Sequence, residues 1–579
     1  MPTNSGAYDE NDATRQTADP ADGIGHVVTS PTANGSRDVP DAQNAASTDE
    51  TLNAHVKKRA VGGKRAANGL TKKGWIWAIA AMVVVVALIS VFLVIRQKAE
   101  IVTDRAHQAD SVSIGLKLAP TNLDIRNQSG TSLDQVLVGN VYEGIVARDS
   151  HNNVVPGLAK SWEKSADGTI YTFHLNDNMT FSNGDKLDAE DVAWSINELM
   201  VNHYHSSELL MNFKSAIAAD TDTVKIELTA PYSDLLWVLA CRPGLVLDRN
   251  AEYDIKTQAV GSGPYTVAKF VPNDSITLKA NPHYWGGGKA ITQTVVLRYF
   301  ADDNAAVNAL KSGDVQVLAP VSENLAGPFE KDNEHYRVAA GDGTDKFVLA
   351  MNSKGAATSD IRVRRAIRHA IDHKQLIASR GGADKPLGGP IASLDPGYED
   401  LTGLYPHDVD EARELMKEAG YTTENPLELR LTYANTYGTE LGDQLRSQLK
   451  PIGINLKVNM VEFSTWLQDV LKNKDYDLSL VDHNESHDFS QWTDDQYYYN
   501  YSNEKVKNYY RQAMAASDDS QRDALLSKAA RQVSEDAPAD WLFNYRITTA
   551  MKTGVTGFPL NLNQTLLPLR DVTYVPAQR

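Results

Sequence analysis

Two pairs of histidines are the residues whose spacing first suggests chemistry. In the segment His483-Asn484-Glu485-Ser486-His487 the two imidazoles are four residues apart, the spacing that lets one helix face hold a metal ion. The glutamate is at the wrong offset to act as the base of a metalloprotease, and the flanking residues are typical of a loop. His203 and His205 belong to a second segment with the composition of a surface loop. We therefore expect no metal site at either pair.

Motifs for covalent catalysis are absent from the sequence. It contains no G-x-S-x-G elbow, no P-loop and no H-E-x-x-H. Its single cysteine, Cys241, excludes a disulfide framework and a cysteine-based zinc site, and we interpret it as an inert buried thiol. The sequence thus predicts no catalytic residue and no cofactor, and a surface hydrolase is only a minor alternative.

The composition limits the class of partner. The chain has 579 residues, with 57 lysines and arginines against 74 aspartates and glutamates, which gives a net charge of −17. An acidic chain repels the phosphate backbone, so we expect no nucleic-acid partner. At roughly 150 residues per domain, the length predicts about three or four domain-sized units.

The N-terminal hundred residues differ from the rest. Residues 1–73 are rich in small polar residues and carry seven lysines and arginines near their end, which predicts a disordered cytoplasmic tail with a basic flank. Residues 74–96 contain the uncharged run Trp75–Ile95, whose length as a helix, about 30 Å, matches a bilayer core. No small-residue cleavage site follows. We expect a single transmembrane helix in the cell membrane, a linker over 97–110, and an extracellular C-terminal part.

The extracellular part has the mixed pattern of an α/β protein. Period-two alternation with β-branched residues predicts strands at Ser111–Lys117, Tyr171–Leu175, Thr223–Leu228, Ser275–Lys279 and Thr294–Tyr299. Acidic starts and glycine ends predict helices at Ala189–Val201, Asn304–Ser312, Asp360–Ser379 and Asp408–Gly420. The order Leu427–Tyr433, Tyr437–Lys450, Asn455–Val461 predicts a βαβ unit with parallel strands.

Six motifs in this region occur in the order typical of one family. They are carried by Leu123–Gly144, Pro156–Ser195 (PGLAKSWEKSADGTIYTFHLNDNMTFSNGDKLDAEDVAWS), Gly261–Gly287, Asp302–Val317, Asp360–Asp372 (DIRVRRAIRHAID) and Asp410–Tyr421. Together they cover most of residues 111–579. The chain resembles the extracellular solute-binding proteins of family 5, the oligopeptide, dipeptide and nickel-binding receptors of ABC importers.

The resemblance implies a two-lobed, periplasmic-binding-protein-like fold of the large peptide-binder type (class II). The first lobe would span 111–343, the second 344–545, and residues 546–579 would return to the first. It implies a monomeric receptor that captures a peptide or similar small solute by lobe closure and delivers it to ABC permease subunits. Receptors for an oligosaccharide or a metal complex, and a sensor that signals through the N-terminal tail, are the alternatives.

The resemblance also implies where the ligand contacts lie. In peptide-binding members, a strand after a Tyr-Asp pair is followed by an aspartate that holds the peptide amine. Here Tyr476–Val481 matches that strand, but the usual G-W-x-x-D text is absent from the segment with His483 and Asn484. Glu485 or Asp488 is the candidate for the amine, since a carboxylate beside an ammonium makes a charge-assisted bond.

Further candidates are aromatic or polar, and His483 and Asn484 of the same segment are among them. Trp492 and Tyr497 follow the strand, and they form either a cleft wall or core packing. The candidates from the first lobe are Arg126, Gln135, Asn140 and Tyr142, with Arg126 suited to a ligand carboxylate.

Overall fold

A computed structural model of the chain describes residues 108–563 and 565–576. The predicted cytoplasmic tail (1–73), the predicted transmembrane helix (74–96) and most of the linker (97–110) lie outside these residues. Within the described part, no helix is long and apolar enough to span a membrane.

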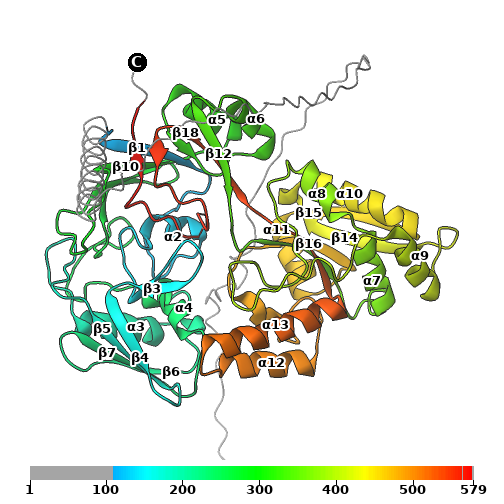
Figure 1. Ribbon diagram of the computed structural model, residues 1–579, viewed down its shortest axis with the longest axis horizontal. Helices are drawn as coiled ribbons and strands as arrows, with labels where there is room; N and C mark the ends of the chain where they lie inside the picture. Colours follow the sequence, from blue (N-terminus) through cyan, green and yellow to red (C-terminus); the bar gives the residue numbers. More distant parts are fainter. Residues whose placement is uncertain (1–107, 564, 577–579) are drawn as a thin grey trace, which may run out of the picture. The chain divides into compact units, whose positions relative to one another are not determined.

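A seven-stranded sheet forms the centre of one lobe (Figure 1). Its strand order is β12 (Tyr336–Gly341), β18 (Ile547–Lys552), β11 (Val317–Leu318), β1 (Ser111–Leu116), β10 (Thr294–Tyr299), β9 (Ser275–Ala280) and β8 (Tyr265–Val271). Alternate residues of β1, namely Val112, Ile114 and Leu116, are buried, as the period-two pattern predicts. β1 runs parallel to β10 and β11, while β18 near the C-terminus inserts between β11 and β12. The C-terminal return is thus part of this sheet.

The helices α2 (Thr131–Leu137), α5 (Asp303–Ser312) and α6 (Glu323–Lys331) belong to the same lobe. The start and end of α5 follow from its sequence. The Asp302 side chain accepts a hydrogen bond from the Ala305 N–H, and Gly313 ends the helix at a φ of 88°.

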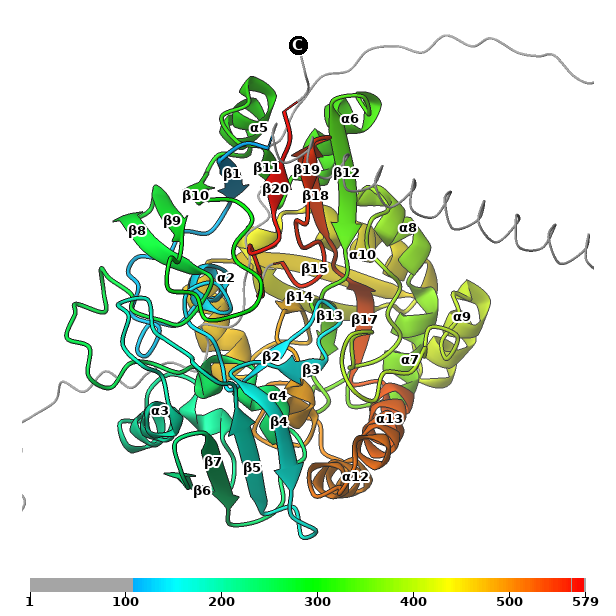
Figure 2. The same ribbon diagram turned by 60° about the vertical axis from the view of Figure 1, so that its left-hand side comes forward.

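A four-stranded sheet forms a separate layer (Figure 2), in the order β4 (Ala159–Lys164), β5 (Ile170–Leu175), β7 (Thr223–Leu228) and β6 (Phe213–Ala218). Helix α3 (Ala189–Val201) packs on β6 and β7, and it begins with a capping box between Asp188 and Asp191. Further short elements within residues 108–341 and 547–576 are β2 (Val146–Arg148), β3 (Val154–Pro156), α4 (Leu235–Leu239), β19 (Val555–Thr556) and β20 (Thr573–Tyr574). Residues 108–341 and 547–576 are called lobe I below.

Residues 346–544, called lobe II, contain a five-stranded sheet in the order β15 (Ile454–Val461), β14 (Leu427–Ala434), β16 (Leu478–His483), β13 (Lys346–Met351) and β17 (Ala539–Asn544). β14 and β15 are parallel and connected through α10 (Glu440–Leu449), which confirms the predicted βαβ unit. The other helices are α7 (Ile361–Ala370), α8 (His373–Ser379), α9 (Val409–Glu418), α11 (Phe463–Trp466), α12 (Glu504–Met514) and α13 (Asp519–Asp536). α12 and α13 lie side by side in both views.

The single helix predicted over Asp360–Ser379 is wrong, because two helices occupy this range. α7 ends before Ile371, which has an extended backbone, and α8 begins after Asp372. The Asp372 side chain accepts a hydrogen bond from the Gln375 N–H, so it starts a new helix rather than continuing the old one.

The chain passes between the two sheets twice. β12 of lobe I leads into β13 of lobe II over residues 342–345, and β17 of lobe II returns to β18 of lobe I over 545–546. These crossings lie beside the lobe boundaries predicted at 343/344 and 545/546. Residues next to a crossing lie close to both sheets, and the candidate site begins at such a residue, Lys346.

Candidate functional site

Lys346, the first residue of β13, is a buried cation directly after a crossing. Its side chain is 1% exposed, and Nζ donates to the carbonyls of Glu485 (2.7 Å) and Thr344 (3.1 Å). Nζ also lies 3.2 Å from the carboxylate of Asp488. Burial raises the pKa of Asp488 to about 7 although the ammonium opposes this shift. Three acceptors thus satisfy the three donors of the lysine.

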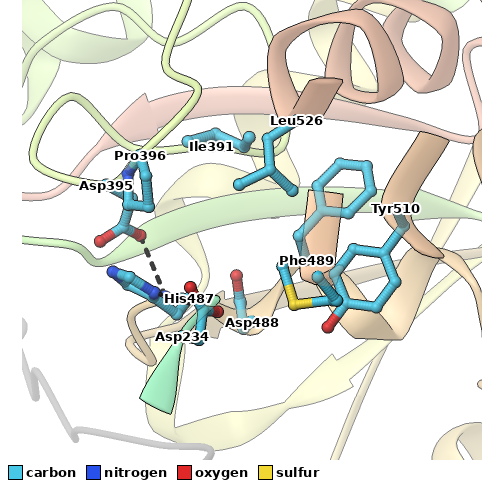
Figure 3. A pocket seen from close by; sticks show the side chains of 10 residues that line it. Asp234, Ile391, Asp395, Pro396, His487, Asp488, Phe489, Tyr510 and Leu526 are labelled. Atoms are coloured by element: carbon cyan, nitrogen blue, oxygen red, sulfur yellow. Dashed lines mark hydrogen bonds and ion pairs between the residues drawn. The ribbon is translucent and has the colours of Figure 1, made fainter. Parts of the chain in front are cut away.

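A cavity of about 20 Å³ lies next to this ion pair (Figure 3). The carboxylates of Asp234, Asp395 and Asp488 surround His487 at one end, while Phe489, Tyr510 and Leu526 form the other end. Ile391, Pro396 and Met514 complete the lining. Asp234 belongs to lobe I and the other lining residues to lobe II. The cavity is therefore built from both lobes.

His487 joins the lobes at the edge of the cavity. Its imidazole stacks on the Trp237 indole of lobe I, with ring centroids 4.0 Å apart and planes at 12°. Its Nδ1 lies 3.3 Å from Oδ2 of Asp234. Burial opposes ionisation of Asp234, but the attraction of His487 outweighs it and lowers the pKa of this carboxyl.

A second contact between the lobes lies beside the first. Nδ2 of Asn152 in lobe I donates to Oδ1 of Asp395 (3.0 Å) and to Oγ of Ser486 (2.8 Å) in lobe II. Ser486 also donates to Asp395, at 2.5 Å. These bonds fix the loop that carries Asp395 and the segment that carries His487 against the same asparagine.

The predicted residues of the segment after β16 differ in their surroundings. His483 is fully enclosed, and its Nε2 lies within hydrogen-bond distance of the hydroxyls of Tyr498 (3.0 Å) and Tyr499 (2.9 Å). Burial, helped by the charge of Lys346, lowers the pKa of His483 to about 3, so the imidazole is neutral. Asn484 is buried, and its backbone carbonyl accepts from Oγ1 of Thr344.

The carboxylates of Glu485 and Asp488 differ in whether a residue of the protein already binds them. Asp488 is paired with Lys346, whereas no hydrogen bond to the Glu485 carboxylate is formed by any residue that the structure describes. Burial raises the pKa of Glu485, and Lys346 opposes that shift. Of the two predicted acids, Glu485 is the one whose side chain is left for an external partner.

The two predicted aromatic residues take part in one aromatic cluster. Trp492 is 1% exposed and stacks on Tyr499 at 4.1 Å with the rings 6° from parallel, and its other neighbours include Trp541 and Tyr501. Of its two interpretations, packing in the hydrophobic core is the one that this burial matches. Tyr497 is only partly buried and packs against His483, Tyr498 and Tyr499.

The four candidates from lobe I are not brought to the cavity. Asn140 donates to the carbonyls of Gln135 and Leu567 and accepts from the N–H of Leu569, which ties α2 to the C-terminal return. Gln135 donates to the carbonyl of Asn563 (2.6 Å).

The remaining two candidates contact residues of lobe I, although Nη2 of Arg126 is buried without a hydrogen-bond partner among the described residues. Tyr142 is fully buried and shares a hydrogen bond with Tyr253. Arg126 lies over the rings of Trp194 (4.7 Å) and Tyr204 (5.0 Å).

Sequence reasoning missed Lys346, Asp234, Trp237 and Asp395. Lys346 left one detectable signal, because it is a charged residue at the start of a strand whose other residues are apolar. Asp234, Trp237 and Asp395 lie in loop and helix sequences that contain no recognisable motif. Only the approach of the two lobes gives them a common neighbour in His487.

The two histidines whose spacing would suit a metal ion lie in different environments. His483 faces the tyrosines and His487 faces Trp237 and Asp234. Among residues 108–563 and 565–576, no group of three or more histidine, cysteine, aspartate or glutamate side chains is arranged to hold a metal ion.

Comparison with known proteins gives relatives at moderate identity. Protein XP55 of Streptomyces lividans is 32% identical over 326 residues, which is 54% of this chain and 58% of that protein. Di/tripeptide-binding protein 2 of Pseudomonas aeruginosa is 25% identical over 513 residues, covering 78% of this chain and 93% of that protein.

The fold has solved counterparts. The structure of NikA from Brucella suis in complex with Fe(III)-EDTA superimposes with a TM-score of 0.72 at 22% identity, covering 80% of this chain and 99% of that one. At this identity the likeness shows a shared fold. Residues 153–509, more than half of the chain, match the model of bacterial extracellular solute-binding proteins, family 5. The chain therefore belongs to the bacterial extracellular solute-binding proteins of family 5.

Proposed function

We propose that this chain is the substrate-binding receptor of an ABC importer, which captures a small solute between its two lobes and delivers it to a permease. The observation that carries the proposal is the cavity to which Asp234 of lobe I and Asp395, His487 and Asp488 of lobe II all contribute. A solute that contacts both lobes stabilises only their closed arrangement, so it shifts the equilibrium between open and closed forms. Family membership supports the same function.

The solute class that we propose is a peptide or a similar small molecule. The Pseudomonas aeruginosa relative is a di/tripeptide-binding protein, which supports a peptide as the solute. Glu485 is the proposed contact for a peptide amine, because its carboxylate lies near Tyr497 and has no hydrogen-bond partner in the described part of the chain. Asp488, His483 and Asn484 belong to the same segment and are held by Lys346, by the tyrosines and by Thr344, respectively.

The receptor is also proposed to be held at the cell membrane. The support is the uncharged run Trp75–Ile95 with its basic N-terminal flank. In this arrangement residues 1–73 face the cytoplasm and the lobes face outward. An external protease added to intact cells is expected to remove the lobes and leave the tail protected. Recovery of a mature soluble protein that begins near residue 97 would contradict the anchor.

Mass spectrometry of the solute that co-purifies with the full chain tests the receptor function. We expect one stoichiometric small molecule, released on unfolding. Lobe closure is tested by energy transfer between dyes on Lys214→Cys in lobe I and Lys457→Cys in lobe II, both exposed positions, in a Cys241→Ser background. The solute should raise the fraction of molecules with the shorter dye distance. No change at saturating solute would argue against closure.

A further inference from the structure

We propose that the cavity between Asp234 and Asp488 is a subsite for an alkylammonium group, so that the receptor prefers solutes with a positively charged aliphatic side chain. This inference rests on the proposed receptor function and names the solute class of that site. The lining combines carboxylates at one end with an apolar surface at the other (Figure 3).

The charges around the cavity do not balance. Three carboxylates face it, namely Asp234, Asp395 and Asp488, against the cations of Lys346 and, when protonated, His487. The charge of Arg522 also acts on Asp234, but Arg522 is itself paired with Asp519 and Asp523. At least one negative charge is therefore in excess when all three acids are ionised. All three side chains are at least nine-tenths buried. An uncompensated charge at such a place is costly, and a bound cation removes that cost.

Asp234 supplies a free acceptor atom. Its Oδ2 is near His487, but its Oδ1 is buried and has no hydrogen-bond partner among the described residues. Asp395 differs, because its oxygens accept from the neutral donors Asn152 and Ser486 and from the N–H of His487. Asp488 differs again, because Lys346 is already bound to it. The orphan oxygen of Asp234 is thus the position at which a further N–H group gains a bond.

The size and the apolar end specify the kind of cation. A cavity of about 20 Å³ admits little more than one water-sized group, and an ammonium is of that size. Phe489, Tyr510, Met514 and Leu526 line the other end of the cavity, so a bound ammonium lies beside an apolar surface and away from water. Because Asp234 and Asp488 come from different lobes, a cation between them is held by both only when the lobes are closed.

The test uses two tripeptides of equal shape. Ala-Lys-Ala carries the ammonium, and in its partner the lysine is replaced by 2-aminoheptanoic acid, whose terminal methyl group takes the place of the ammonium. Both are titrated by calorimetry into the full chain in detergent. We expect the lysine peptide to bind at least about 30-fold more tightly, the lower end of what a buried charge pair contributes.

Three variants make the result specific. Asp234→Asn should reduce the preference for lysine to within about 3-fold; its side chain does not cap α4, so the substitution removes charge and no cap. Asp177→Asn, an exposed acid of the same lobe, should leave the preference intact. Asn152→Ala breaks the other contact between the lobes and should weaken both peptides to the same extent, so the preference for lysine stays. A merely structural role of the contacts between the lobes would instead reduce the preference in this variant as it does in Asp234→Asn.

Each contrary outcome has a defined meaning. Equal affinity for the two peptides, or an undiminished lysine preference in Asp234→Asn, overturns the subsite and leaves the receptor function standing. Failure of both peptides to bind also overturns the subsite. The receptor function is then judged separately, by whether a stoichiometric solute co-purifies with the chain.

Discussion

The two segments that carry most of the predicted ligand contacts, 126–142 in lobe I and 482–499 in lobe II, have very different surroundings. In the first, the polar atoms of Asn140 and Gln135 bind backbone groups of the C-terminal return. In the second, the chain leaves β16 close to a crossing, and His487 reaches Asp234 and Trp237 of the other lobe. Both segments have partners distant in sequence, but only the second has partners from the opposite lobe, and this separates the site from the structural segment.

The difference has a physical origin in what each segment must satisfy. A buried polar group without a hydrogen-bond partner costs about 1–3 kcal/mol of stability, so a neighbouring surface that offers a partner stabilises it. For the lobe I segment that surface belongs to the same lobe. For the lobe II segment part of it belongs to the opposite lobe or, in our proposal, to the solute. Four substitutions test this comparison, in order of expected effect.

Lys346→Met should have the largest effect. It leaves Asp488 and the carbonyls of Glu485 and Thr344 buried without their donor, which we expect to lower the free energy of unfolding by about 3–5 kcal/mol. The loss should be greater at pH 8 than at pH 5, since protonation of Asp488 relieves the unpaired charge at the lower pH. Urea titrations at both pH values measure it. The exposed Lys354→Met is the control, expected within about 0.5 kcal/mol of the parent.

Asp482→Asn should change the pH dependence of stability. Burial raises the pKa of Asp482 to about 7, with Lys346 and Arg380 opposing, from an ordinary value of about 3.9 in the unfolded chain. Between these values the folded state binds more protons, so stability falls as the pH rises from about 4 to 7. This fall in the free energy of unfolding amounts to up to about 4 kcal/mol in the parent, and the variant should not show it because it has no carboxyl group to titrate. Thermal unfolding of both proteins at pH 5 and pH 8 measures the difference, and parallel curves would contradict it.

Asn140→Ala should lower the free energy of unfolding and leave the affinity for the solute nearly unchanged. It removes three hydrogen bonds to buried backbone groups, so we expect a loss of about 2–3 kcal/mol. Solute affinity should stay within about 3-fold of the parent, because the proposed site does not include this residue. The exposed Asn202→Ala serves as the control for stability. A much weaker affinity in a folded Asn140→Ala protein would return lobe I to the site.

Arg126→Met should have the smallest effect. The guanidinium loses its contacts with Trp194 and Tyr204, worth about 1 kcal/mol. Affinity for the co-purified solute should not change, and a titration with that solute checks it. A selective loss of affinity for solutes that carry a carboxylate would support the alternative role that the sequence suggested for this arginine.

The sequence alone was sufficient for the local elements and the family. Strands such as Ser111–Leu116 and the unit from β14 through α10 to β15 follow from residue periodicity, because period two and period 3.6 are properties of neighbouring residues. The break between α7 and α8 was missed although Asp372 signals it, because a capping aspartate and an ordinary helical aspartate have the same letter.

The composition of the site was decided only by tertiary structure. Nothing local distinguishes Asp234, Trp237 or Asp395, and His487 connects them because two chain crossings bring the lobes together. The same holds for Asp488, whose role depends on Lys346, a residue 142 positions earlier in the chain. The periodicity of apolar residues in the sequence indicates which side of a helix or strand is buried. It does not indicate which charge faces a given carboxylate, because that depends on where other elements end once the sheets have packed.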